Sequence, residues 1–285
     1  MNIIVCLKQV PGITEVKINP ETNTLIREGI KNIINPFDTY ALEEAVRLKE
    51  KYGGKATALS MGPPQALDML REAISLGADD ALLLSDRAFA GADTWATAFT
   101  LAAAIKKLEQ IDLIICGRQS TDGDTAQVGP ELAELLGSPF IAYVGRIEEI
   151  STGQMRVKRM IDEGHEVIES PMPLVITVTK EINVPRLPSL RGMMKSKSAK
   201  IPLWTAQEMG LDRKTALLAS AHALGDGIIA WRDGKHSLES LLQEAATPGG
   251  IAATTMSGMD AAGYGSAVRK GLMAGLRRAR ANARK

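Results

Sequence analysis

The chain has 285 residues, 45% of them hydrophobic and 24% charged, and its formal net charge at pH 7 is +1. This composition is typical of a folded, water-soluble protein with one large or two smaller domains. The near-zero charge argues against bulk electrostatic binding to nucleic acid or a membrane surface, and 4% aromatic residues are too few for base-stacking platforms.

The cysteines and histidines indicate neither a disulfide framework nor a metal site. Cys6 and Cys116 lie in apolar runs, where buried thiols are common, so we expect a reducing, cytoplasmic location. The three histidines lack metal-ligand spacing. No basic leader followed by an apolar stretch begins the chain, and no apolar run approaches the ~20 residues of a membrane-spanning helix. We therefore expect neither a signal peptide nor a membrane span.

Strand-like and helix-like segments alternate through the first half of the chain. Short apolar runs predict strands at 3–7, 56–61, 81–84 and 112–116. Helices are expected after 35–38 with Asp38 as N-cap, from the prolines at 63–64, from 95 to about 108, and near 128. A β-hairpin is expected over 16–27. The alternation predicts an α/β fold with a doubly wound, mainly parallel sheet.

In such sheets, ligands bind beyond the carboxyl ends of strands, near the point where the strand order reverses. The polar loops at 6–10, 61–64 and 117–125 all fall at strand ends of this kind. We therefore expect a binding site where these three loops meet.

The loop at 117–127 is the most informative of the three. It is rich in Gly, Ser, Thr and Asp and leads from an apolar strand into a helix. Free amides and hydroxyls beside a helix N-terminus favour an anion such as phosphate, so nucleotide binding is the first hypothesis. The alternative is a plain connecting loop with Thr125 or Asp124 as N-cap. There is no Walker lysine and no GxGxxG pattern, so a nucleotide would bind by another geometry.

The second half of the chain has a different character. Strands are expected at 144–150, 154–159, 166–170 and 174–179, completing the same domain. The basic segment 185–202 is bounded by prolines and has no periodicity, so it is expected to be a loop whose leucines and methionines pack inward or await a partner. The expected organisation is a nucleotide-binding α/β domain (1–185), a partner-recognition loop and linker (186–212) and a helical C-terminal extension (213–285).

Four stretches, at 5–10, 35–38, 117–128 and 187–197, resemble the beta subunits of electron transfer flavoproteins in order and spacing over roughly residues 1–205. The resemblance implies a bound adenine nucleotide: AMP in ordinary members, a second FAD in electron-bifurcating ones. Segments 8–11, 17–27 and 85–94 look more like the bifurcating branch, so FAD is expected, with AMP as the alternative. By position, the nucleotide contacts would be Cys6, Asn35, Pro36, Phe37, Asp38, Met61, Gly117, Arg118, Gln119, Ser120, Thr121, Asp122, Gly123, Asp124, Thr125, Ala126, Gln127 and Val128.

The resemblance also implies partners. An electron transfer flavoprotein alpha subunit would hold the electron-transferring FAD, and electrons would pass between flavin dehydrogenases or NADH and later acceptors, with flavin-based bifurcation as the finer expectation. Leu190 matches the leucine that anchors the dehydrogenase, and Arg191 and Met194 complete the expected partner-binding set. No side chain is expected to act as a catalyst, because the flavin supplies the redox chemistry.

Two alternatives remain open at the level of sequence. The chain could be a non-redox adenine-nucleotide-binding scaffold or regulatory protein of the same fold. Segment 213–285 weakly resembles the C-terminal helical domain of pyrroline-5-carboxylate reductases, but the chain has no room for that enzyme's dinucleotide domain, so reductase activity is not expected. The segment is either a helical extension with a solvated basic face, or an element of self-association or a replaced partner-docking arm.

Overall fold

The computed structural model of the chain describes residues 1–12, 32–108 and 110–211, all of which belong to one compact unit. The expected hairpin at 16–27 and the helical extension at 213–285 lie outside the described residues. Within the described ranges, no helix has the length and apolar character needed to span a bilayer.

A nine-stranded sheet runs through the described residues in the order β11-β5-β4-β1-β6-β10-β7-β8-β9. The seven strands from β11 to β7 are parallel, and β8 and β9 are added antiparallel. The predicted α/β fold with a mainly parallel sheet is confirmed. The strands are β1 (Asn2–Cys6), β4 (Lys55–Met61), β5 (Asp80–Leu84), β6 (Leu113–Gly117), β7 (Phe140–Ser151), β8 (Gln154–Ile161), β9 (Gly164–Pro171), β10 (Leu174–Val178) and β11 (Leu203–Trp204).

The strand order reverses beside β1. From β1 the chain passes through α1 (Pro36–Tyr52) to β4 and through α2 (Ala66–Ser75) to β5, all on one side of β1. It then crosses through α3 (Thr94–Ile105) to β6 on the other side. The carboxyl ends of β1 and β6 therefore meet at the topological switch point, where ligands bind in folds of this class. A short antiparallel pair, β2 (Gln9–Pro11) with β3 (Asn32–Ile34), lies between β1 and α1 in the chain.

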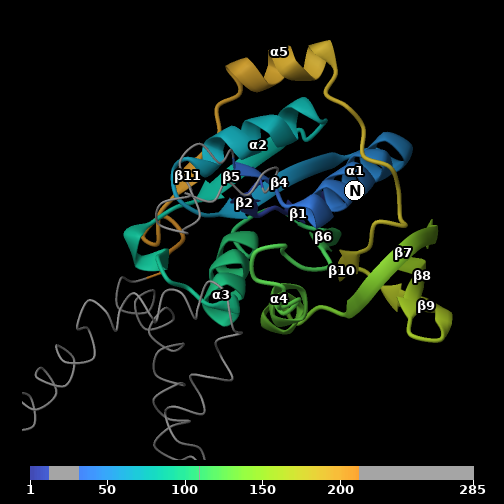
Figure 1. Cartoon of the computed structure of the whole chain (residues 1–285). Helices are drawn as coiled ribbons and strands as arrows, with labels where there is room; N and C mark the ends of the chain where they lie inside the picture. The colour runs from blue at the N-terminus through green and yellow to red at the C-terminus, as the bar shows by residue number, and fades with distance from the viewer. Residues whose placement is uncertain (13–31, 109, 212–285) are drawn as a thin grey trace, which may run out of the picture. The chain divides into compact units, whose positions relative to one another are not determined.

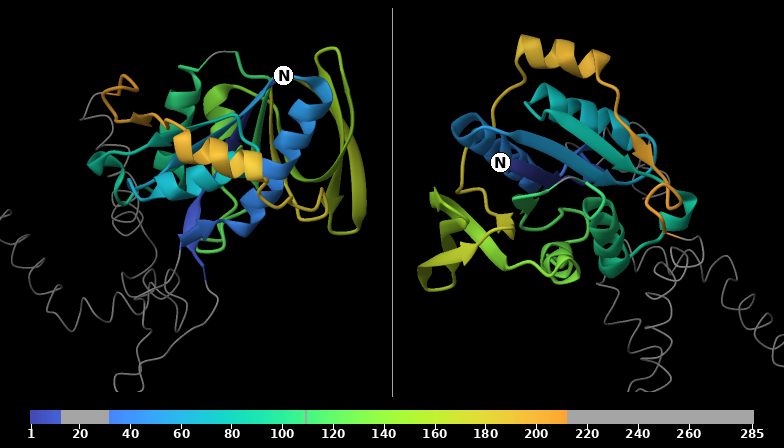
Figure 2. Two further views of the ribbon diagram at one scale, coloured as in Figure 1. Left: turned by 90° about the horizontal axis from the view of Figure 1, so that it is seen from above. Right: turned by 180° about the vertical axis from the view of Figure 1, so that it is seen from behind.

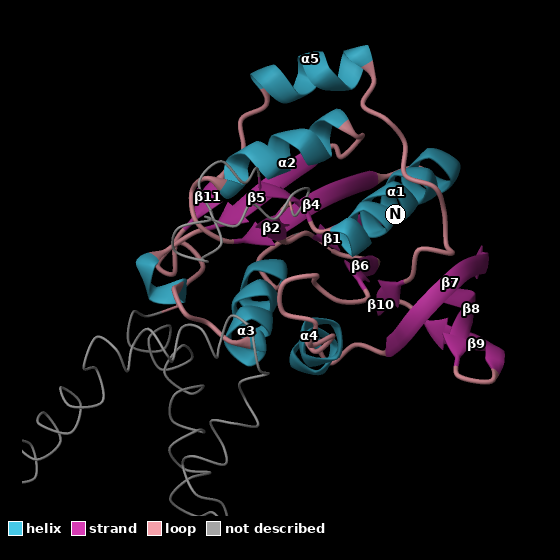
Figure 3. Cartoon of the chain, viewed as in Figure 1, coloured by secondary structure: helices cyan, strands magenta, loops and turns pink. Residues whose placement is uncertain are grey.

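Helices cover both faces of the sheet (Figure 1, Figure 3). Alternate residues of β1 enter two separate cores: Ile3 and Val5 pack with side chains of α1 and α2, while Ile4 and Cys6 pack with side chains of α3 and α4 (Val128–Leu136). Both sets are buried, as expected for a central parallel strand. This burial explains why the strand reads as a continuous apolar run.

The N-cap predicted for α1 and the start predicted for α2 are wrong, whereas α4 begins at Val128, as expected. The N-cap of α1 is Asn35, and Asp38 lies inside the first turn with its carboxylate accepting a hydrogen bond from the Lys8 N–H. The N-cap of α4 is Gln127, so neither Thr125 nor Asp124 has that role. The prolines at 63–64 precede α2, which begins at Ala66. Asp38 makes a tertiary contact with Lys8 instead, and Asp124 contacts Gln119 within its own loop.

The segment 185–202 is not a loop, contrary to the prediction. It contains α5 (Leu190–Ser198), capped by the Ser189 hydroxyl, which accepts a hydrogen bond from the Gly192 N–H at 2.9 Å. Figure 2 shows α5 lying outside α2, and a Cβ at Gly192 would overlap the Ser75 carbonyl oxygen. Nine residues interrupted by a glycine give too weak a helical period to detect in the sequence. The chain then forms the edge strand β11 beside β5.

Candidate functional site

A cavity of about 370 Å³ opens at the carboxyl edge of the sheet, at the β1/β6 switch point. Its lining comes from the ends of β1, β4 and β6 and from the N-terminal turns of α1, α3 and α4. Small-molecule sites typically measure about 300–1,000 Å³, so the cavity has the size of a ligand site.

The lining is divided by polarity. Its buried part is formed by apolar side chains and two thiols: Leu59, Leu101, Cys6 and Cys116, with the partly buried Met61 beside them. The more exposed part carries cations, hydroxyls and amides, contributed by Lys8, Arg118, Ser120, Thr125 and Gln127. An apolar slot beside a polar mouth suits a ligand with a flat heterocycle at one end and an anionic group at the other.

Asn35 joins the two walls of the cavity. Its side-chain amide donates to Asp38 Oδ1 at 2.9 Å and to the Gln119 carbonyl oxygen at 2.8 Å, and its side-chain oxygen accepts from the Thr121 N–H at 3.1 Å. Its own N–H donates to the Lys8 carbonyl oxygen at 2.8 Å. Because Asn35 is 1% exposed, no solvent can replace these bonds. The residue therefore fixes the loop after β6 against the start of α1.

Asp38 is a buried carboxyl at the same junction. It accepts a hydrogen bond from the Lys8 N–H at 2.7 Å and another from Asn35. Burial raises its pKa to about 7, and the hydrogen bonds from the Lys8 N–H, Asn35 and the Gly117 N–H only partly oppose that rise. A Cβ at Gly117 would overlap Asp38 Oδ1 and lie 2.7 Å from the Phe37 carbonyl carbon. Only glycine allows β6 to approach α1 this closely.

Lys8 and Asp122 form an ion pair at the mouth, with 2.7 Å between Lys8 Nζ and Asp122 Oδ1. The Lys8 ammonium also donates to Ser120 Oγ at 3.4 Å. Burial would raise the pKa of Asp122, but the hydrogen bond and charge of Lys8 outweigh it and lower that pKa. A half-exposed lysine held by one carboxylate remains able to meet a second anion.

The loop at 117–127 has a constrained conformation. Asp124 and Ala126 have φ values of 54° and 56°, in the left-handed region that non-glycine residues rarely adopt. The Gln119 amide donates to Asp124 Oδ1, and Arg118 Nε donates to Gln119 Oε1 at 2.8 Å. The Arg118 guanidinium also lies over the ring of Phe37, 5.3 Å from its centroid. Unfavourable backbone angles held by side-chain contacts are typical of ligand-binding loops.

Three helix N-termini, those of α1, α3 and α4, contribute to the cavity lining, and only that of α3 has a side-chain cap. At α3 the Asp93 carboxylate accepts from the Ala96 N–H at 2.8 Å. At α4 the N-cap Gln127 makes no capping bond, and its side-chain oxygen instead accepts from the Thr94 hydroxyl at 3.3 Å. At α1 the N–H groups of Asp38 and Thr39 donate to the Asn35 carbonyl oxygen. The first amides of α4, which no side chain caps, are available to an anion in the cavity.

The structure brings most of the sequence-predicted site residues to one cavity. Thirteen of them line it: Cys6, Asn35, Asp38, Met61, Gly117, Arg118, Gln119, Ser120, Gly123, Thr125, Ala126, Gln127 and Val128. Five do not line it: Pro36, Phe37, Thr121, Asp122 and Asp124. Phe37, Thr121, Asp122 and Asp124 instead contact residues that do.

Sequence reasoning placed Leu7 and Lys8 in an expected binding loop without naming them as contacts, and it missed Leu59, Leu101, Cys116, Gly129 and the N-terminal turn of α3. Lys8 was detectable, because it follows β1 directly at a predicted ligand-binding edge. The α3 contribution needed the fold, since nothing in the sequence pairs residues 93–97 with the loop at 117–127. Among the described residues, no group of three or more His, Cys, Asp or Glu could hold a metal ion.

The fold and cavity define a class: a doubly wound α/β protein with a small-molecule site at the switch point of its sheet. The family model described as "Electron transfer flavoprotein domain" matches residues 22–209. The chain belongs to the electron transfer flavoprotein family, and it resembles the beta subunits of that family.

Curated relatives support the assignment. Over 75% of this chain and 82% of the relative, the sequence is 52% identical to the electron transfer flavoprotein subunit beta of Thermoanaerobacterium thermosaccharolyticum. It is 50% identical to subunit CarD of the caffeyl-CoA reductase-Etf complex of Acetobacterium woodii, over 74% of this chain and 80% of the relative. It is 42% identical to protein FixA of Azotobacter vinelandii, over 74% of this chain and 77% of the relative. Electron transfer is the function class to which these relatives point.

Proposed function

We propose that the chain binds an adenine nucleotide, FAD, in the cavity at the β1/β6 switch point. Paired with an alpha subunit, it relays electrons between a flavin dehydrogenase or NADH and a later acceptor, with bifurcation at the FAD of this chain. AMP in the same cavity is the alternative ligand. The observation that carries the proposal is the pairing of a buried apolar slot with the uncapped N-terminus of α4 in one cavity.

The residues present fit such a ligand. The apolar part near Cys6 and Met61 matches a flat heterocycle, while the amides of α4 and the hydroxyls of Ser120 and Thr125 match phosphate. Asp122 and Asp124, whose charge would repel phosphate, are turned to Lys8 and Gln119 and do not line the cavity. Bound FAD would supply the redox chemistry, and the chain would supply position and electrostatics.

Partner binding is proposed at α5. Leu190 is 79% exposed and Met194 73%, and no residue of α5 is buried. Exposed apolar side chains on one short helix are typical of a protein interaction site. CarD, as its name states, is a subunit of a complex that contains caffeyl-CoA reductase. For this chain we propose a flavin dehydrogenase as the partner at Leu190, Arg191 and Met194, in addition to the alpha subunit.

The proposal is tested by purifying the chain with its alpha subunit and titrating the complex anaerobically with NADH and with a reduced flavin dehydrogenase. The account predicts flavin absorbance that bleaches with at least one donor and recovers with an acceptor. A complex that contains AMP but no reducible flavin would favour the non-redox scaffold instead.

A further inference from the structure

The link between β10 and α5 crosses the surface of α1 with little apolar contact of its own. We call residues 183–189 the strap. Leu187 in the strap is 87% exposed and Val184 is 78% exposed. With Leu190 and Met194 of α5, Leu187 forms an apolar set that we call the docking face. Because the strap buries so little apolar surface, something other than hydrophobic packing must hold it in place.

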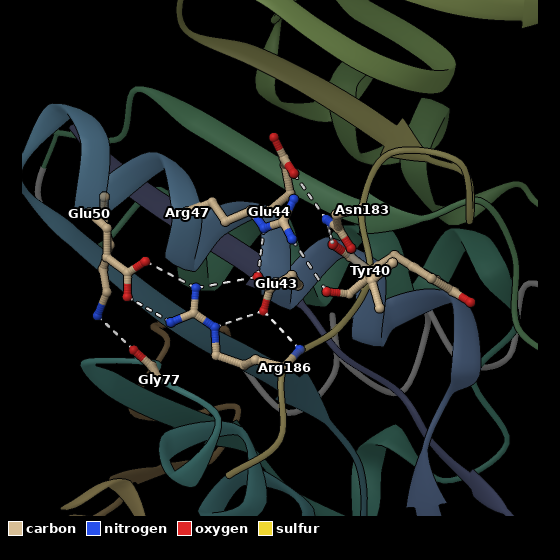
Figure 4. Close-up of polar contacts among 10 residues, drawn as sticks. Tyr40, Glu43, Glu44, Arg47, Glu50, Gly77, Asn183 and Arg186 are labelled. Carbon is tan, nitrogen blue, oxygen red and sulfur yellow. Dashed lines mark hydrogen bonds and ion pairs between the residues drawn. The ribbon is translucent and has the colours of Figure 1, made fainter. Parts of the chain in front are cut away.

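The strap is held by ion pairs to α1. The guanidinium of Arg186 donates to both carboxylate oxygens of Glu50, at 2.7 and 3.0 Å, and to both oxygens of Glu43, at 2.8 and 3.3 Å. The Arg186 N–H also donates to Glu43 Oε2 at 3.1 Å. We call these three residues the Arg186 clamp (Figure 4). Because the guanidinium group is planar and binds two carboxylates at once, it fixes both the orientation of the strap and its distance from α1.

The clamp is anchored in the protein interior. Glu43 is 4% exposed, and burial alone would raise its pKa, but hydrogen bonds from Arg186 and Arg47 outweigh burial and lower that pKa. Asn183 adds a second anchor, donating to the Tyr40 carbonyl oxygen at 3.0 Å and to Glu44 Oε2 at 2.9 Å. Apart from Ser189, which caps α5, the strap is held through Asn183 and Arg186 on α1, the helix whose first turn forms part of the cavity wall.

The docking face has a defined chemistry. Arg191, Lys195 and Lys197 stand on the same short helix as Leu190 and Met194. Apolar side chains among basic ones fit a partner that offers an apolar pocket with an acidic rim. That complementarity, and the reductase named with CarD, lead us to take a flavin dehydrogenase as the occupant.

The C-terminal end of α5 is held on α2, where Arg71 donates to the carbonyl oxygens of Ser196 and Ala199 at 2.9 and 3.1 Å. We propose that Arg186 is a positioning residue for electron delivery: its clamp holds the strap, with Leu187 and the start of α5, on α1, so that the docking face meets the dehydrogenase in one orientation. The inference rests on the proposed function. Without the clamp, the strap samples other conformations, and the apparent affinity for the dehydrogenase falls with the fraction that remains competent. The rate of electron transfer within the docked complex stays the same, because the cavity is untouched.

Steady-state kinetics of the dehydrogenase, with the complete complex of this chain and its alpha subunit as electron acceptor, test the inference. Arg186→Gln is expected to raise the KM for the complex about tenfold at unchanged kcat and unchanged nucleotide content. Two milder variants are expected to raise the KM less. Arg186→Lys keeps the charge but loses the bidentate geometry of the guanidinium, and Glu50→Gln changes a carboxylate that is exposed. The matched control is Arg156→Gln, which removes an arginine paired with Glu148 and Glu149 on the β7–β8 hairpin and should leave the KM unchanged.

An unchanged KM in Arg186→Gln, or an equal rise in the Arg156→Gln control, overturns the inference. If Arg186→Gln does not fold, the Glu50→Gln variant tests the inference in its place. An unchanged KM in Glu50→Gln would then contradict the proposed role of the clamp. Hydrogen exchange of residues 183–198 gives a readout independent of electron transfer. Faster exchange in Arg186→Gln than in the wild type supports the clamp, and equal exchange contradicts it. If the wild-type complex accepts no electrons at all, the proposed function fails, and the exchange measurement still judges the clamp.

Discussion

The side-chain amide of Asn35 donates a hydrogen bond to the carbonyl oxygen of Gln119 at 2.8 Å, across 84 residues of sequence. The bond joins the entrance of α1 to the loop that follows β6, the two segments that meet at the switch point of the sheet. The walls of the cavity are thus fixed to each other by one buried polar residue, and its removal should affect both stability and ligand binding.

Asn35→Ala is therefore expected to lower the free energy of unfolding by about 2–3 kcal/mol, because it leaves buried partners unsatisfied. Nucleotide content should fall with it. Chemical denaturation and ligand quantification measure the two effects. The control is Asn32→Ala, at an exposed asparagine on β3, which should change neither. Wild-type stability in Asn35→Ala would show that the loop is held by other contacts.

Gly117→Ala probes the close approach of β6 to α1. The added Cβ would overlap Asp38 Oδ1 and the backbone of Phe37, so the start of α1 must shift. We expect a loss of about 1–3 kcal/mol in stability. Gly123→Ala is the matched comparison, since its Cβ would lie 3.3 Å from Ser120 Oγ and meet no backbone. Thermal unfolding of the two variants should separate them clearly, and equal melting temperatures would refute the steric argument.

The raised pKa of Asp38 predicts a pH dependence of stability. Burial raises its pKa in the folded state to about 7, whereas the ordinary value is 3.8. The folded state therefore holds the proton more tightly, and this contribution to stability, complete below pH 3.8, is lost as the pH rises toward 7. Between pH 5 and pH 7 the loss should reach about 2 kcal/mol. Asp38→Asn should flatten this part of the curve, whereas Glu163→Gln in the exposed β8–β9 turn should not. Equal slopes in both variants would contradict the assignment.

Leu190→Ala separates docking from nucleotide binding. The side chain is 79% exposed and lies on α5, outside the cavity lining. Stability and nucleotide content should match the wild type. The KM of a flavin dehydrogenase for the complex should rise about tenfold, because the variant loses a side chain that anchors the interface. Leu203→Ala, at a less exposed edge position on β11, serves as the control. Unchanged kinetics in Leu190→Ala would place the dehydrogenase elsewhere.

The sequence predicted the parallel sheet because its central strands are apolar on both faces, as Ile3 to Cys6 illustrate. It also predicted the position of the cavity, because in a doubly wound sheet the polar loops that follow the central strands come together at the switch point. It failed at α5, where nine residues around Gly192 owe their helix to packing on α2. It failed again at the N-cap of α1, where the tertiary contact of Asp38 with the Lys8 N–H overrides local preference. The Arg186 clamp joins residues 136 positions apart or more, beyond any local pattern.

The proposed function requires the cavity at the β1/β6 switch point to hold an adenine nucleotide. Acid release of bound ligands from the complex with the alpha subunit, followed by mass spectrometry, tests it most directly when the wild type is compared with Gly123→Leu, which fills part of the cavity. The account predicts two FAD per complex in the wild type and one in the variant. A single FAD in both, with no AMP in either, would contradict it.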